Sequence, residues 1–321
     1  GRTAGKVTWD EKTGKPSIEM IDQPRNLWLG WGQSDYKSLN WAAYVYRLTP
    51  ESVYEDFGLV TLNREYNGST LPYVTAPGTV DINLNLLKAV ELALTGGRDL
   101  VPAVDPITGV ARPIVQAGPR TGDATRFKGF EAFWDAYAEQ TRYLVRRAVA
   151  VYEAGEAVRA RFCPTPYLSC LVRGCAEKAT DITRGGAELN FVTLEAVTFA
   201  TTVDSLLAVK FLVFDAKKCT MAELIAALKD NWQGHETLQA WARNRAPKYG
   251  RDDDAADAMG RRVMDLWTGE AWRYRTASTG RQVRPGMLSW NYWVGDGYVL
   301  AASPDGRPKG QFLSNAICPS N

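Results

Sequence analysis

Apolar residues recur with a helical period over one long stretch, residues 130–162. From Phe133 to Val151 they are spaced by three, four or seven positions, which places them on one face of a helix. Pro164 and Pro166 follow directly, and proline does not continue a helix. The pattern predicts one long amphipathic helix that ends before Pro164.

Several shorter helices and a few short strands are predicted around this long helix. A helix is expected from a cap at Asp81 to Gly96, and residues 203–214, apolar on nearly every side, suggest a buried helix. Thr220 and Glu223 have capping-box spacing for a helix running to Trp232, and the acidic residues 252–254 suit the start of another. Residues 51–60 suggest a short helix running into a strand, whereas residues 98–125 and those after Gly280 suggest loops and short strands. This alternation favours the α/β class.

The composition limits the classes of protein to which the chain can belong, but it does not indicate an activity. The chain has 321 residues, 45% of them hydrophobic, and a formal net charge of +2. The near-neutral balance favours no nucleic-acid partner, and no apolar run approaches the roughly eighteen residues of a membrane span. Five cysteines in such a length form no disulfide framework, so we expect a reducing cytoplasm. The chain does not begin with Met, and we expect a segment of a longer protein.

The polar candidates each have a simpler structural explanation. The single histidine, His235, lies in a polar break and suits a surface or capping role, which disfavours histidine-based catalysis. The acidic residues 252–254 fit a helix cap better than a metal site. We expect a turn at residues 295–297 (GDG) and ordinary packing for the tryptophans at positions 28, 31 and 41.

Cys175 and Glu177 form the sharpest local string. A cysteine two residues before a glutamate could pair a nucleophile or thiyl radical with an acid/base group. The surrounding residues 168–178 have the spacing of an amphipathic helix, in which a lone cysteine usually packs as a small hydrophobe. Both interpretations remain open at this point.

Five strings in order resemble the glycyl radical enzymes, the family of pyruvate formate-lyase. They comprise residues 164–169 (PTPYLS) with 174–191 (GCAEKATDITRGGAELNF), residues 203–210 (VDSLLAVK), residues 247–257 (PKYGRDDDAAD), residues 284–286 (RPG) and residues 302–307 (ASPDGR). The order and spacing agree over about residues 50–321. The resemblance implies a ten-stranded α/β barrel, and we expect residues 1–321 to be a single domain forming most of it.

The resemblance also implies a radical mechanism with two finger loops inside the barrel. A glycyl radical, installed by a radical S-adenosylmethionine activating enzyme, takes hydrogen from a cysteine, and the resulting thiyl radical takes hydrogen from the substrate. Leu62 stands where that cysteine is expected, and the sequence contains no radical-glycine loop. Cys175 matches a different cysteine of the family. We therefore predict that this chain alone is inactive and binds no cofactor.

Two apolar stretches suggest a branch of the family. We expect Leu194, Val197, Leu288 and Trp290 to line one apolar cavity near Leu62, with Leu194 and Val197 sharing a face if their segment is helical. An apolar pocket suits a hydrocarbon or aromatic substrate, as in the benzylsuccinate and alkylsuccinate synthases, which add such a substrate to fumarate. Arg64 is the candidate for binding the fumarate carboxylates.

Two alternatives remain. One is an arylacetate decarboxylase or another glycyl radical lyase. The other is an inert barrel subunit that binds or stabilises a partner, such as another chain or segment that completes the barrel.

Overall fold

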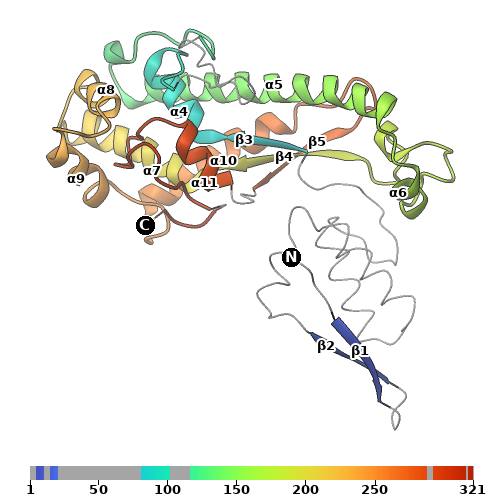
Figure 1. Ribbon diagram of the computed structural model, residues 1–321. Helices are drawn as coiled ribbons and strands as arrows, with labels where there is room; N and C mark the ends of the chain where they lie inside the picture. The colour runs from blue at the N-terminus through green and yellow to red at the C-terminus, as the bar shows by residue number, and fades with distance from the viewer. Residues whose placement is uncertain are drawn as a thin grey trace, which may run out of the picture. The chain divides into compact units, whose positions relative to one another are not determined.

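The structure is a computed structural model that describes residues 5–10, 15–20, 81–101, 116–287, 292–315 and 317–320. The chain divides into two compact units, one of Gly1–Thr79 with Gly155–Phe191 and the other of Val80–Ala154 with Val192–Asn321. Figure 1 labels the elements, which are β1 (Gly5–Asp10), β2 (Lys15–Met20), β3 (Ile82–Asn85), α4 (Leu86–Thr95), η1 (Ala124–Arg126), α5 (Phe130–Phe162), α6 (Pro166–Leu171), η2 (Ile182–Arg184), β4 (Phe191–Val197), α7 (Phe199–Val209), the π-helical η3 (Lys210–Asp215), α8 (Met221–Lys229), α9 (Glu236–Asn244), α10 (Asp254–Ala271), β5 (Gln282–Met287) and α11 (Tyr292–Val299).

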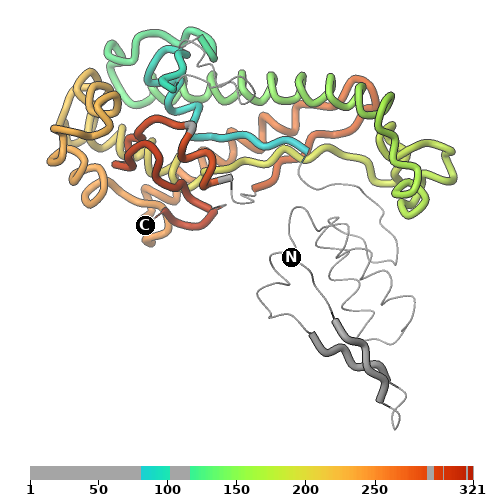
Figure 2. Tube along the Cα trace, viewed as in Figure 1, coloured from blue at the N-terminus to red at the C-terminus, as the bar shows by residue number. Residues whose placement is uncertain are grey.

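A three-stranded sheet organises the second unit, in the order β3-β4-β5. Strands β3 and β4 are parallel, in a register that pairs Ile82 with Leu194 and Asn85 with Val197. Each of these strands leads into a helix, β3 into α4 and β4 into α7, as the trace in Figure 2 shows. Two parallel strands that each feed a helix are the hallmark of an α/β fold.

One face of this sheet packs against the helices. Val192, Leu194 and Ala196 of β4 belong to the main hydrophobic core together with Ile82 of β3 and Val283 of β5. Helix α7 contacts both α4 and α10, and every one of its residues is buried. Side chains alternate between the faces of a strand, so the residues between these core positions point to the other face.

The two strand-to-helix joints are bonded to each other. The Asn85 side chain caps α4 by accepting from the backbone N–H groups of Leu87 and Lys88. Thr198, with a left-handed φ of 69°, forms the joint between β4 and α7. Its hydroxyl donates to Asn85 Oδ1 at 3.0 Å and accepts from the N–H of Leu87 at 3.2 Å. These bonds fix the β3–β4 register at its carboxyl end.

Three of the strings that carried the resemblance meet in one buried polar cluster. Asp204 of α7 accepts from the backbone N–H of Tyr249 at 2.8 Å, and the ammonium of Lys248 donates to the carbonyl of Asp305 at 3.2 Å. Ser205 and Ser303 both donate to the Asp305 carboxylate. Four charged side chains of this cluster, those of Asp204, Lys248, Asp305 and Arg307, are at most 6% exposed.

Arg307 ties the last part of that cluster together. Its guanidinium donates to the hydroxyl of Ser303 and to the carbonyls of Ala301, Pro308 and Gln311. Burial lowers the pKa of Arg307, and the nearby Asp305 and Glu91 carboxylates oppose that effect. The SPDGR string therefore has a structural role, because its arginine closes the loop that contains it.

In the first unit, a compact segment forms around Asp181. Its carboxylate accepts from the hydroxyls of Ser169 and Thr183 at 2.8 and 2.6 Å and from the backbone N–H of Thr165. A small core of Val172, Cys175, Ile182 and Ala187 packs nearby. The helix expected over residues 168–178 is wrong, because α6 ends at Leu171 and turns follow.

The structure confirms most of the helices that it describes. The long helix is α5, α4 ends at the left-handed Gly96, and the Thr220–Glu223 capping box starts α8. Asp253 caps α10 as its acidic sequence predicted. The expected helix and strand at residues 51–60 and the tryptophans at positions 28, 31 and 41 lie outside the described residues.

Three boundaries differ from expectation. Asp81 precedes a strand instead of capping a helix, since β3 intervenes and Asn85 is the cap. Helix α8 ends at Lys229, and a turn carries the chain to Trp232. Residues 295–297 lie inside α11 rather than in a turn. An added Cβ at Gly297 would overlap the carbonyl of Gln311, so close packing, not a turn, requires that glycine.

Candidate functional site

The sheet face opposite the helices is polar. Asp81 directly precedes β3, and Asn83 is paired in register with Glu195 of β4. Thr193 lies two residues before Glu195 and therefore on the same face. On β5, the alternation that sends Val283 into the core places Arg284 and Gly286 on this polar side. Asn83 and Arg284 are exposed, whereas Glu195 and Thr193 are buried.

Asp81 is held at the start of the sheet by donors from two other segments. Its carboxylate accepts from the backbone N–H of Thr193 at 2.9 Å and from the hydroxyl of Tyr152 at 3.2 Å. The N–H of Asp81 in turn donates to the Thr193 hydroxyl at 3.1 Å. Arg281 donates to the Tyr152 hydroxyl at 2.8 Å and lies over its ring. These donors stabilise a negative charge on Asp81 and fix its position.

Glu195 lies beside this fixed charge. Burial raises the pKa of Glu195, the Asp81 carboxylate raises it as well, and together they bring it to about 7. The Glu195 carboxylate sits against the backbone of Gly286, where any added Cβ would overlap both of its oxygens. Near neutral pH the side chain is thus present as both acid and carboxylate, which is the condition for a general acid or base.

A third carboxylate lies near the carboxyl end of β3. Burial raises the pKa of Asp296 of α11, and a hydrogen bond with Asn85 lowers it. Ligands of open α/β sheets bind beyond the carboxyl ends of the strands. Acidic groups therefore lie before β3 at Asp81, on β4 at Glu195, and near the carboxyl end of β3 at Asp296.

The expected apolar pocket is only partly within the described chain. Leu62, Arg64, Leu288 and Trp290 lie outside the described residues. Leu194 and Val197 do not share a face, because residues 191–197 form a strand and not a helix, and residues three apart in a strand point to opposite faces. Leu194 is part of the core beneath the helices. Their roles in substrate binding stay a prediction.

Cys175 and Glu177 show the features of structural residues. Cys175 is 3% exposed, and burial raises the pKa of its thiol, which disfavours the thiolate. An Oε atom of Glu177 accepts from the backbone N–H of Gly174 at 2.9 Å. His235 precedes α9, and its ring lies 3.1 Å from the carboxylate of Asp230, in agreement with the surface role expected for it.

Sequence reasoning missed Glu195. The signal was present, since Glu195 is the only charged residue in the run FVTLEAV of β4. A charged side chain within an apolar strand is expensive to bury without a partner, so it calls for a chemical explanation. The described residues contain no cluster of three or more side chains suited to a metal ion, and none of their helices has the length and hydropathy to cross a membrane.

Comparison with known proteins identifies the class. The family model for pyruvate formate lyase-like proteins matches residues 76–296. The chain belongs to that family, and its α/β fold is that of the glycyl radical enzymes, as the sequence predicted.

The relatives define the group further. Trans-4-hydroxy-L-proline dehydratase of Clostridioides difficile is 33% identical over 74% of this chain and 28% of its own length. Isethionate sulfite-lyase of Bilophila wadsworthia is 33% identical over 74% of this chain and 27% of its own. The chain thus spans little more than a quarter of the length of these relatives.

Solved structures agree. The B12-independent glycerol dehydratase of Clostridium butyricum superposes with a TM-score of 0.67 at 32% identity, covering 76% of this chain and 29% of that one. A glycyl radical enzyme from Archaeoglobus fulgidus gives a TM-score of 0.68 at 29% identity, covering 83% and 34%. These relatives include dehydratases and a sulfite-lyase, enzymes named for removing a small group from their substrates.

Proposed function

We propose that this chain forms part of the substrate-binding wall of a glycyl radical lyase that eliminates a small group from a polar substrate. The observation that carries the proposal is Glu195, a buried carboxyl group with a pKa of about 7 on the polar face of the sheet. Dehydratases and sulfite-lyases among the relatives support the same class of reaction.

Glu195 supplies the proton that an elimination of water requires. For a 1,2-diol, a hydrogen atom leaves one carbon and the C–O bond of the neighbouring carbon breaks. The acid form of Glu195 gives its proton to the departing hydroxyl, which leaves as water. The proton of the remaining hydroxyl returns to Glu195, a carbonyl forms, and the hydrogen atom is restored to carbon. The net change is loss of one water molecule. The radical residues of the holoenzyme supply only the hydrogen-atom transfer, and because Leu62 stands where the thiyl cysteine is expected, that transfer needs a cysteine from another part of the holoenzyme.

Asp81 has a positioning role in this scheme. Its charge is fixed by the Thr193 N–H and the Tyr152 hydroxyl, and it favours the protonated form of Glu195. Gly286 leaves the space in which that carboxyl group rests. Asp81 and Gly286 thus keep a protonated Glu195 carboxyl group available on the polar face of the sheet.

Fumarate addition is the second candidate. Arg284 is exposed on the polar side of β5, where an arginine could pair with a dicarboxylate. A hydrocarbon substrate, however, needs an apolar wall, and Leu194 faces the helices instead. Elimination therefore has the stronger support. An inert, partner-stabilising role is supported only by Leu62 and by the absence of a radical-glycine loop from this sequence.

The test uses the full-length gene product that contains this chain, activated anaerobically by a radical S-adenosylmethionine enzyme. Glycerol, trans-4-hydroxy-L-proline and isethionate are compared with toluene plus fumarate. We expect elimination products, and a kcat for dehydration lowered about 10²–10⁴-fold by Glu195→Gln. Glu139→Gln, a change at an exposed carboxylate of α5, is the matched control. A succinate adduct without elimination, or an unchanged kcat for Glu195→Gln, would overturn the proposal.

A further inference from the structure

A hollow separate from the polar sheet face lies in the second unit, in the region of the α4 C-terminus and α8. It is a cavity of about 640 Å³ lined by residues of α4, of the segments 98–100 and 116–125, and of α8. Leu94 and Ala124 are buried, and Leu100 and Ile225 are half-buried, so part of its wall is apolar. The volume is in the range of pockets that hold small molecules.

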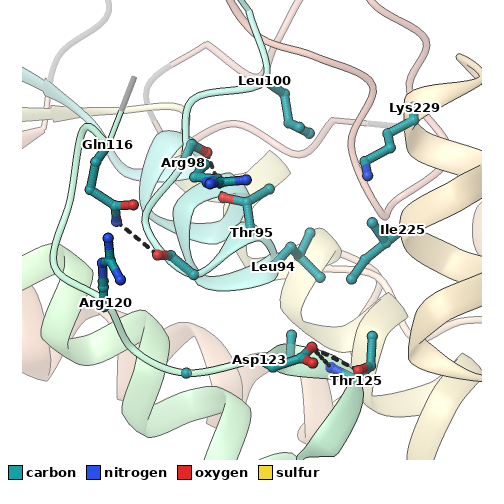
Figure 3. A pocket seen from close by; sticks show the side chains of 13 residues that line it. Leu94, Thr95, Arg98, Leu100, Gln116, Arg120, Asp123, Thr125, Ile225 and Lys229 are labelled. Atoms are coloured by element: carbon teal, nitrogen blue, oxygen red, sulfur yellow. Dashed lines mark hydrogen bonds between the residues drawn. The ribbon is translucent and has the colours of Figure 1, made fainter. Parts of the chain in front are cut away.

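Three cations come to this cavity from three separate segments. Arg98 and Lys229 extend toward each other from opposite walls in Figure 3, and Arg120 lies beside Gln116. Within the described ranges, none of the three side chains forms an ion pair or a hydrogen bond. Like charges that share one hollow repel each other, and an anion between them would remove that repulsion.

The lining contains one carboxylate, that of Asp123, and it is already engaged. Asp123 accepts from the backbone N–H and the hydroxyl of Thr125 at 3.0 and 2.7 Å, and it lies 3.4 Å from Arg126. Figure 3 shows the two hydrogen bonds between Asp123 and Thr125. The charged groups of the lining are thus three cations against one carboxylate, and the excess is positive.

The walls are held by hydrogen bonds that do not use the cations. The Gln116 amide donates to the carbonyls of Gly96 and Gly118, both at 2.8 Å. The backbone N–H groups of Ala117 and Gly118 donate to the carbonyl of Gly97. An added Cβ at Gly97 would overlap the Gln116 amide and the carbonyl of Pro119, so the two segments approach as closely as glycine allows. The frame is therefore formed before any ligand arrives.

The positions of two of the cations could be explained without any ligand, because Lys229 lies in the last turn of α8 and Arg98 follows the end of α4. Positive side chains stabilise helix C-termini through the helix dipole. That explanation does not cover Arg120, which belongs to a loop, nor the open hollow that the three exposed side chains line. We propose that this cavity binds a small organic anion, one with a carboxylate or phosphate for Arg98, Arg120 and Lys229 and an apolar part for Leu94 and Ile225.

The test titrates the purified protein with inorganic phosphate, phenyl phosphate and benzoate, with benzyl alcohol as the neutral analogue, and measures binding by calorimetry and by NMR shifts. We expect saturable binding of phenyl phosphate that is tighter than that of phosphate and weakens with added salt. The double variant Arg98→Ala/Lys229→Ala should raise the Kd at least about 10-fold, the scale of a lost charge-assisted contact.

Lys128→Ala is the matched control, because Lys128 is exposed a few residues from the cavity and does not line it. It should change the Kd less than about two-fold, which is within the range of a screened surface charge. Circular dichroism checks that each variant remains folded. The proposal fails if no anion saturates, if benzyl alcohol binds as well as phenyl phosphate, or if Lys128→Ala weakens binding as much as the double variant. None of these results depends on the lyase reaction.

Discussion

Two regions of the second unit bury carboxyl groups with raised pKa values, and they differ in what surrounds those groups. In the cluster of Asp204, Lys248, Asp305 and Arg307, carboxylates and cations alternate. Burial and the Asp305 carboxylate raise the pKa of Asp204, Lys248 and the Tyr249 N–H lower it, and the net value is about 6. On the sheet face, both causes acting on Glu195, burial and the Asp81 carboxylate, raise its pKa, which reaches about 7.

The difference distinguishes a charged cluster that stabilises the fold from a carboxyl group that is suited to acid–base chemistry. A buried charge with compensating partners holds segments together, and its proton is of no further use. A buried carboxyl group that has a second carboxylate beside it and no cation to compensate it destabilises the folded state when ionised, and such an arrangement is typical of functional sites. The motifs that revealed the family belong mainly to the first region, whereas the residue with an available proton lies in the second.

The largest effect is expected from breaking the charged cluster. Arg307→Met removes four donated hydrogen bonds and leaves Asp305 without that neighbouring cation. We expect the free energy of unfolding, measured with urea, to fall by about 3–5 kcal/mol. Arg261→Met, at an exposed position of α10, is the control and should change it by less than about 0.5 kcal/mol. Equal effects of the two changes would show that the cluster has no structural role.

A smaller effect of opposite sign is expected at Glu195. Its folded pKa is raised above the ordinary value, so the stability linked to its neutral form is present below about pH 4.5 and is lost as the pH rises through about 7. Glu195→Gln cannot ionise. Relative to the wild type, its free energy of unfolding should therefore gain about 1–3 kcal/mol between pH 4 and pH 8. Urea unfolding across this range with Glu139→Gln in parallel measures it, and a pH-independent difference would contradict the assignment.

The smallest effect concerns the contact between Gly286 and Glu195. A Cβ at residue 286 overlaps the Glu195 carboxylate, so Gly286→Ala should destabilise by about 1–2 kcal/mol. In the background of Glu195→Ala most of that loss should disappear, and a double-mutant cycle measures the coupling. Gly269→Ala in α10, where an added Cβ meets nothing within 4 Å, controls for the change itself. Additive effects would mean that the two residues do not share the space.

Sequence reasoning succeeded where the local rules are strong. The period of α5, the Thr220 capping box and the acidic start of α10 are set by neighbouring residues, and each was predicted. It failed at β3 and β4, although both strands alternate between apolar and polar residues, because alternating runs this short were interpreted as parts of helices. Because the β4 segment was treated as helical, Leu194 and Val197 were predicted to share a face, and Glu195 was not recognised as a candidate site residue. The pairing of Asn83 with Glu195, separated by more than a hundred residues, lies beyond any local pattern.

The bond between Thr198 and Asn85 has a consequence for how such a protein can change over evolutionary time. A parallel strand that slipped by one residue would exchange its two faces, and the bonded joint at the carboxyl end opposes that slip. The side chains of the polar face can then be replaced one at a time while the frame stays in place. A lineage with this joint can vary an exposed position of that face, such as Asn83, by single substitutions without losing the fold.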